Sequence, residues 1–246
     1  PWSDPIYVNS HGFDPSLFHD DDGRKWFLTL QWNHRSDSVG GHPKHPAFDG
    51  ILLQEWVPGV GLTGAARVIF EGSAHGLTEG AHLYKRDGWY YLTVAEGGTG
   101  YQHAVTMARS RDILGPYALH PDTHLLTAKD TPEAPLQRVG HGQIVETPEG
   151  ETYHTFLCSR PLPGRHSPLG RETGIERCVW RDGWLYPETG NLVPRIEIPH
   201  SATSTNAAAP VLCRFDGQTL PPEFQWLRTP YPDRIFTLTG TALRLI

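Results

Sequence analysis

The chain has 246 residues and a formal net charge of −6, with 21 Lys and Arg against 27 Asp and Glu. This acidic balance excludes a basic surface for nucleic-acid phosphates, and no apolar run approaches the about 20 residues that span a bilayer. The 26 glycines, 22 prolines and 11% aromatic residues disfavour a helical bundle and favour a turn-rich, all-β protein.

One sequence unit recurs along the chain. It opens with a polar residue, continues as a short apolar strand, turns at an acidic residue followed by glycine, and returns as an aromatic strand. In three copies the polar residue stands nine positions before the glycine, in the pairs Asp14 and Gly23, Glu79 and Gly88, and His141 and Gly150. Acidic-Gly pairs between apolar runs are typical of hairpin turns, so each copy predicts a hairpin. A fourth, shorter copy turns at Gly183.

Further hairpins are expected between these units, over 51–70 and 104–119. Two hairpins make a four-stranded sheet. The unit starts lie 65 and 62 residues apart, from 14 to 79 and from 79 to 141, which is typical of β-propeller blades with long connections. A jelly roll would not explain the repeat.

The three leading residues, Asp14, Glu79 and His141, occupy equivalent places in successive blades. Equivalent residues on the innermost strands of radially arranged blades converge on the central axis. A single such residue is better explained as the cap of its own turn. Three in register favour a common site of titratable groups.

The repeat is lost near residue 200. Residues 200–210 are small, polar and end in Pro210, which predicts a linker. We therefore expect a propeller domain over 1–199 and the beginning of a second β domain over 211–246. Cys158, Cys178 and Cys213 cannot make a closed disulfide framework and are expected as buried apolar residues, although one pair stays open.

Five ordered motifs resemble glycoside hydrolase family 43, especially its β-xylosidase and α-L-arabinofuranosidase branch. They are Gly12–Gly23, Leu77–Lys85, Ala95–Thr99, Ala108–Ser110 with Gly115–Tyr117, and Leu169–Thr173. The resemblance implies an all-β, five-bladed propeller whose first blade is largely missing here, with blades 2 to 5 in 1–199 and a C-terminal β-sandwich starting at 211–246. We expect the chain to be a piece of a longer polypeptide, called the parent protein below.

The resemblance also implies an inverting glycosidase that removes xylose or arabinofuranose from the non-reducing end of xylo-oligosaccharides or arabinoxylan fragments. Glu79 matches the general acid, and Asp14 matches the residue that orients the acid and raises its pKa. The family's general base is an Asp of the first blade, which this chain does not contain. We therefore expect the isolated chain to be inactive. No cofactor is required, and no metal ligand set is firm.

Several residues are candidates for substrate binding. Arg171 can donate two hydrogen bonds to adjacent sugar hydroxyls, unless it pairs with Glu172 instead. Trp32 and Phe13 could stack on a sugar ring, although aromatic residues in propellers are more often core. His141 matches a histidine that lies beneath the sugar in the family. The resemblance leaves open whether a structural calcium ion binds on the axis, with His141 contacting a water molecule of that ion.

Other polar residues are expected to be structural rather than functional. His34 and His103 follow strands, and Asp20, Asp21 and Asp22 read as solvated turn charges.

Two other functions remain open from the sequence: a catalytically silent carbohydrate-binding propeller and a protein-interaction propeller. Carboxylates on the axis argue against the second. The sequence leaves homo-oligomer formation open. The absence of an evident cysteine pairing favours a cytosolic localisation, and secretion remains the alternative.

Overall fold

The computed structural model describes residues 12–32, 48–199 and most of 212–246, together with 4 and 6–9. Its contacts divide the chain into two compact units, Pro1–Pro199 and His200–Ile246. The predicted linker at 200–210 lies outside the described residues. Every regular element in the described part of the chain is a β-strand except one 3-10 turn, Pro232–Arg234. No helix found there is long or apolar enough to cross a membrane.

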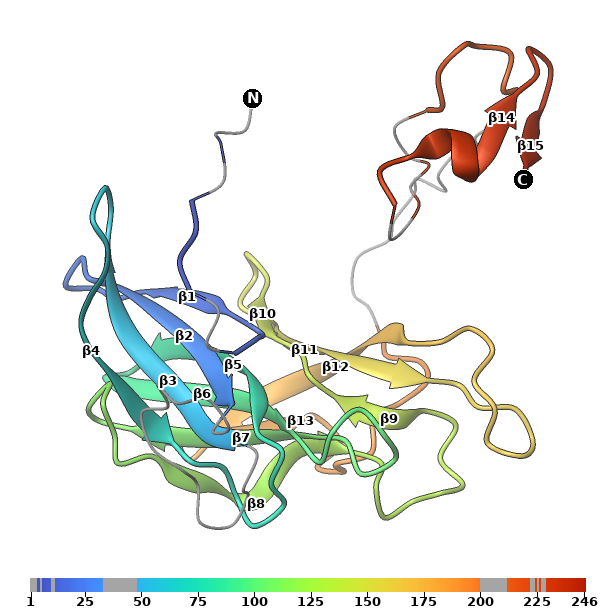
Figure 1. Ribbon diagram of the computed structural model, residues 1–246. Helices are drawn as coiled ribbons and strands as arrows, with labels where there is room; N and C mark the ends of the chain where they lie inside the picture. Colours follow the sequence, from blue (N-terminus) through green and yellow to red (C-terminus); the bar gives the residue numbers. More distant parts are fainter. Residues whose placement is uncertain are drawn as a thin grey trace. The chain divides into compact units, whose positions relative to one another are not determined.

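The first unit is built from three antiparallel sheets that follow one another along the chain (Figure 1). The first sheet has the strand order β1-β2-β3-β4 and the second the order β5-β6-β7-β8. Their strands are β1 Ser16–His19, β2 Lys25–Trp32, β3 Phe48–Val57, β4 Gly61–Phe70, β5 Glu79–Arg86, β6 Trp89–Glu96, β7 Ala104–Ser110 and β8 Ala118–Thr127.

The third sheet runs β10-β11-β12-β13, with β9 also paired to β11. Its strands are β9 Gln137–Gly140, β10 Ile144–Glu146, β11 Thr152–Ser159, β12 Glu172–Arg181 and β13 Trp184–Pro187. We expected four blades within 1–199, but the described part of this range forms three sheets. The reason is that the fourth copy of the repeat supplies the outer strands β12 and β13 of the third sheet.

The predicted acidic-Gly turns form as expected. Asp87 and Gly88, with φ of 51° and 72°, join β5 to β6, and Asp182 and Gly183, with φ of 52° and 70°, join β12 to β13. Two consecutive positive φ angles define the tight hairpin turn whose twist matches that of the flanking strands. Glycine adopts this backbone without steric cost, which is why the sequence pattern locates these hairpins.

The core lies between neighbouring sheets. One cluster joins the first and second sheets through residues such as Leu28, Ile51, Leu83 and Leu92. Another joins the second and third sheets, and includes Tyr91, Met107, Phe156 and Leu185. The leading strands β1 and β5 also contact each other directly. This packing places the beginnings of the sheets side by side.

Asp20 contributes a polar link between the first two sheets. We expected it to be a solvated turn charge, but it is only 6% exposed. Its carboxylate accepts hydrogen bonds from Lys85 Nζ at 2.5 Å and Tyr90 Oη at 2.7 Å, both in the second sheet. Burial opposes ionisation, but the bonds from Lys85 and Tyr90 outweigh it and lower the pKa of Asp20. Asp21 and Asp22 are exposed, as expected.

In the second unit, β14 Phe236–Leu238 pairs with β15 Leu243–Leu245. A two-stranded ribbon is too little to establish a β-sandwich, so that part of the expected fold remains a prediction. The three cysteines are free thiols, with Cys158 and Cys178 buried and Cys213 partly exposed.

Candidate active site

The structure brings the three repeat-leading residues together. Asp14 precedes β1, Glu79 is the first residue of β5, and His141 follows β9. Each offers one oxygen or nitrogen atom within 4.8 Å of those of the other two. His141 Nδ1 lies 3.8 Å from Asp14 Oδ2. Residues that are more than sixty positions apart in sequence therefore form one cluster, as the repeat predicts.

The backbone around this cluster is unusual. Asp14 and His141 have left-handed backbones, with φ of 53° and 45°. Non-glycine residues adopt this region rarely and at a cost. Gly80 packs directly on the imidazole of His141, and a Cβ on it would lie 2.7 Å from Nε2. The glycine after Glu79 therefore allows the acid and the histidine to approach closely.

Glu79 has the electrostatic character of a general acid. Its side chain is almost buried, and the residue is 9% exposed. Burial, with the neighbouring charge of Asp14, raises the pKa of Glu79 to about 7, while the positive charge of Arg171 opposes this rise. A carboxyl group with this pKa is substantially protonated at neutral pH and can donate its proton.

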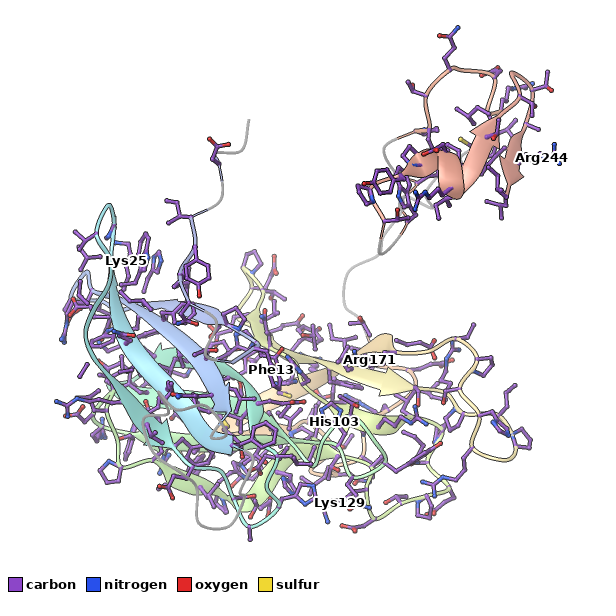
Figure 2. All side chains as sticks on the ribbon, in the orientation of Figure 1. Phe13, Lys25, His103, Lys129, Arg171 and Arg244 are labelled. Carbon is purple, nitrogen blue, oxygen red and sulfur yellow. The ribbon has the colours of Figure 1, made fainter. Side chains whose placement is uncertain are left out.

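Arg171 lies just before β12, and Figure 2 labels it with Phe13 and His103. Its guanidinium is exposed, yet its charge acts on Glu79 and on His103. Glu172 does not pair with it. Glu172 instead accepts hydrogen bonds from Arg160 Nε and Nη2, the latter at 2.6 Å. The alternative in which Arg171 and Glu172 form an ion pair is therefore wrong, and Arg171 remains a candidate for sugar hydroxyls.

The other candidate site residues that the structure describes contact neighbouring parts of the protein. Phe13 is half-buried and meets Phe48 edge to face at 6.5 Å between ring centroids. His103 is buried, and its Nδ1 lies 3.2 Å from the carbonyl oxygen of Arg138. Burial lowers the pKa of His103 to about 4, which keeps it neutral, as expected of a structural histidine. The side chain of Trp32 and all of His34 lie outside the described residues.

His82 is a neighbour of the site that the sequence argument missed. It belongs to β5, the strand that begins with Glu79, and lies beyond an irregularity in the pairing with β6. Burial, followed by the charge of His141, lowers the pKa of His82, while Asp14 opposes this change. Its Nε2 lies 3.2 Å from Gln143 Nε2. Its position three residues after Glu79 was the available signal, but regular strand alternation would have placed it on the opposite face.

Asp14, Glu79 and His141 are also close enough to share a cation, and no other such group is found among the described residues. A cation would need the ionised form of Glu79. The raised pKa instead favours the proton on this carboxyl group, so proton donation and cation binding would compete for Glu79.

Comparison with known proteins identifies the chain's relatives. Glycosyl hydrolases family 43 matches residues 1–185. The chain is 52% identical over 241 residues to xylosidase/arabinosidase 43B of Humicola insolens, covering 96% of this chain and 43% of that protein. It is 44% identical over 252 residues to a β-xylosidase of Bacillus subtilis (strain 168), covering 97% and 46% respectively. The chain thus spans less than half the length of these relatives.

A solved structure shows the same architecture. The crystal structure of xylan β-1,4-xylosidase from Bacillus halodurans C-125 superimposes with a TM-score of 0.88 at 47% sequence identity, covering 100% of this chain and 47% of that one. The three sheets are therefore blades of the five-bladed β-propeller that was expected. The chain belongs to glycosyl hydrolases family 43.

Proposed function

We propose that the parent protein is a glycoside hydrolase that removes xylose or arabinofuranose from the non-reducing end of xylo-oligosaccharides. The observation that carries this proposal is the nearly buried Glu79, whose pKa is raised to about 7 beside Asp14. The names of the relatives, which include a xylosidase/arabinosidase and a β-xylosidase, support this substrate class.

In this proposal Glu79 protonates the glycosidic oxygen as the bond to the sugar breaks. Burial and, after it, charge repulsion from Asp14 hold the pKa of Glu79 high and so keep its proton available. Arg171 is placed to bind sugar hydroxyls, and its charge limits the rise in the pKa of Glu79. The general base would come from a part of the parent protein outside this chain.

The separation of the Asp14 and Glu79 carboxylates bears on the role of Asp14. Acid and base of inverting glycosidases stand about 6.5–9.5 Å apart, which leaves room for the attacking water. One oxygen of Asp14 lies within 4.8 Å of one oxygen of Glu79, which leaves little room for a sugar ring and a water molecule between them. In retaining enzymes the two carboxyl groups stand about 5–5.5 Å apart and the second is the nucleophile, so the stereochemistry of the product distinguishes a helper role of Asp14 from a nucleophilic one.

The test uses the parent protein with 4-nitrophenyl β-D-xylopyranoside, the matching α-L-arabinofuranoside and xylobiose. Proton NMR during the first minutes of hydrolysis should show α-xylose released from the β-xyloside, as inversion requires. Glu79→Gln should lower kcat by about 10²–10⁴-fold on xylobiose, because the amide cannot supply the proton. Glu146→Gln, which changes a glutamate in an exposed ion pair with Arg86, is the control and should leave kcat unchanged.

Two results would contradict the proposal. Release of β-xylose first would replace inversion with retention and make Asp14 the nucleophile. Binding of xylobiose without hydrolysis of any of the three substrates would show a carbohydrate-binding propeller instead of an enzyme.

A further inference from the structure

A second buried carboxylate lies behind the site. Glu96 is the last residue of β6 and is 0% exposed. Its two oxygens accept four hydrogen bonds: Oε1 from the backbone N–H of Ser73 at 2.7 Å and from Thr78 Oγ1 at 2.9 Å, and Oε2 from Ser73 Oγ and Thr106 Oγ1, each at 2.5 Å. Among the described residues, no Lys or Arg pairs with this carboxylate. Four donors, all of them buried, therefore compensate for its burial.

Most of these donors belong to the segment that leads into Glu79. Ser73 and Thr78 both lie in the loop 71–78 between β4 and β5, and Thr78 directly precedes Glu79. Gly72 allows Thr78 to approach the backbone closely, because a Cβ on Gly72 would overlap Thr78 Oγ1. The N–H of Gly97, the residue after Glu96, donates to the carbonyl oxygen of Gly76 at 2.9 Å. The loop is thus fastened to the end of β6 at Ser73, Gly76 and Thr78.

Glu96 is also tied to Glu79 through the sheet. Glu79 pairs with Ala95 across β5 and β6, and Glu96 directly follows Ala95. The pairing is irregular just beyond this point, between Glu79 and His82. Leu77 before it has a left-handed backbone with φ of 53°. The backbone is therefore irregular on both sides of Glu79. Its neighbour Thr78 is held in place by the hydrogen bond to Glu96.

The carboxyl group of Glu79 accepts no hydrogen bond from the described residues. Its location therefore depends on packing and on the backbone that carries it rather than on hydrogen bonds of its own. We propose that Glu96 is a positioning residue for the general acid: by fastening Ser73 and Thr78 it holds the Glu79 carboxyl group where the leaving oxygen must be protonated. This inference rests on the proposed glycosidase function and assigns a role to a residue that touches neither substrate nor the reacting atoms.

The test compares two substrates of the parent protein that differ in leaving group. Xylobiose releases a sugar hydroxyl that needs the proton of Glu79, whereas 4-nitrophenyl β-D-xylopyranoside releases a phenolate that leaves almost without it. In Glu96→Ala we expect kcat/KM to fall about 10–100-fold for xylobiose and less than about 3-fold for the nitrophenyl xyloside, because a displaced acid cannot reach the glycosidic oxygen.

Glu96→Gln should restore most of the xylobiose activity. Its amide oxygen can accept from the Ser73 N–H and Thr78 Oγ1, and its amide nitrogen can donate to the hydroxyl oxygens of Ser73 and Thr106. Thr78→Val removes one loop bond and should reproduce part of the selective loss. Thr106→Val removes a bond from β7 instead and should not.

Glu176→Ala is the matched control for loss of a buried carboxylate. Glu176 belongs to β12 of the third sheet and is also 0% exposed, but it accepts hydrogen bonds from Arg195, which follows β13. Any change in this variant should be equal for the two substrates. Equal losses in Glu96→Ala as well would overturn the positioning role, while activity of the unmodified parent protein on both substrates would keep the proposed function intact. An unmodified parent protein inactive on both would instead refute the proposed function.

Discussion

At the scale of single residues, Glu79 shows what burial adds to a sequence motif. The repeat predicts that Asp14 and Glu79 meet, and repulsion between two carboxylates alone predicts a raised pKa. Burial is nevertheless the larger cause of the rise to about 7. Burial depends on how the blades pack around the residue, and it cannot be predicted from the local sequence.

The raised pKa makes Glu79 a source of pH-dependent instability. Between about pH 4.5 and 7 the folded chain binds more protons than the unfolded chain, so stability must fall as pH rises through this window. We expect Glu79→Gln to raise the free energy of unfolding by up to about 3 kcal/mol at pH 8.5 and to change it little at pH 4. Urea unfolding at the two pH values measures this difference.

The control for that measurement is Glu146→Gln, at an exposed glutamate. It should show no comparable gain at pH 8.5. An equal gain in both variants would mean that overall negative charge, rather than the burial of Glu79, sets the pH dependence.

Two residue-level interpretations failed for one shared reason. The sequence predicts a solvated turn charge at Asp20 and offers Glu172 as the alternative partner of Arg171. The real partners, Lys85 for Asp20 and Arg160 for Glu172, stand 65 and 12 positions away in sequence. Partner choice at such separations follows from tertiary packing, whereas the sequence shows only adjacent charges.

At the scale of elements, the partly buried ion pair between Asp20 and Lys85 joins the first sheet to the second. We expect Asp20→Asn to lower the free energy of unfolding by about 1–3 kcal/mol, because it removes the buried carboxylate that accepts from Lys85 and Tyr90 and leaves Lys85 only the exposed carboxylate of Asp21, at 3.2 Å. Lys85→Met should also destabilise the fold. The double variant should lose less than the sum of the two single losses, as measured by chemical unfolding.

A matched change on the same turn tests whether the link between sheets matters. Asp22→Asn removes an ion pair with Arg24 two positions along, within one exposed turn. Its effect should be small. Equal losses from Asp20→Asn and Asp22→Asn would contradict a role of Asp20 in holding the two sheets together.

The hairpins were the most predictable elements. Asp87 with Gly88 and Asp182 with Gly183 adopt the positive φ angles that the turn type requires, so local chemistry is sufficient to locate them. The number of sheets was less predictable. The unit ending at Gly183 repeats the hairpin but not a complete blade, because β12 pairs with β11 of the preceding copy. Strand pairing between hairpins is a tertiary choice that a local repeat does not encode.

At the scale of the whole molecule, the all-β class, the propeller and the meeting of Asp14, Glu79 and His141 follow from the spacing of the repeat and from the family resemblance. What the spacing could not supply is the network behind the site. Glu96 lies within the family motif Ala95–Thr99, but its hydrogen bonds to Ser73 and Thr78 depend on the path of the loop between β4 and β5.

The expected absence of the general base leads to a prediction about the isolated chain. Residues 1–246 alone should release no detectable 4-nitrophenol from 4-nitrophenyl β-D-xylopyranoside, whereas the parent protein should, because water is not activated without a base. A chromogenic assay at matched concentrations measures this. Turnover by the isolated chain comparable to that of the parent protein would place the base among these 246 residues.

The left-handed backbones of Asp14 and His141 imply a conflict between thermal stability and catalytic activity. Glycine would relieve both residues of an unfavourable conformation while deleting the two groups that surround the acid. A search of random variants for resistance to heating should therefore recover glycine at 14 and 141, and every such survivor should be a poorer catalyst. We therefore expect the most heat-resistant sequence of this protein and its most active one to be different molecules.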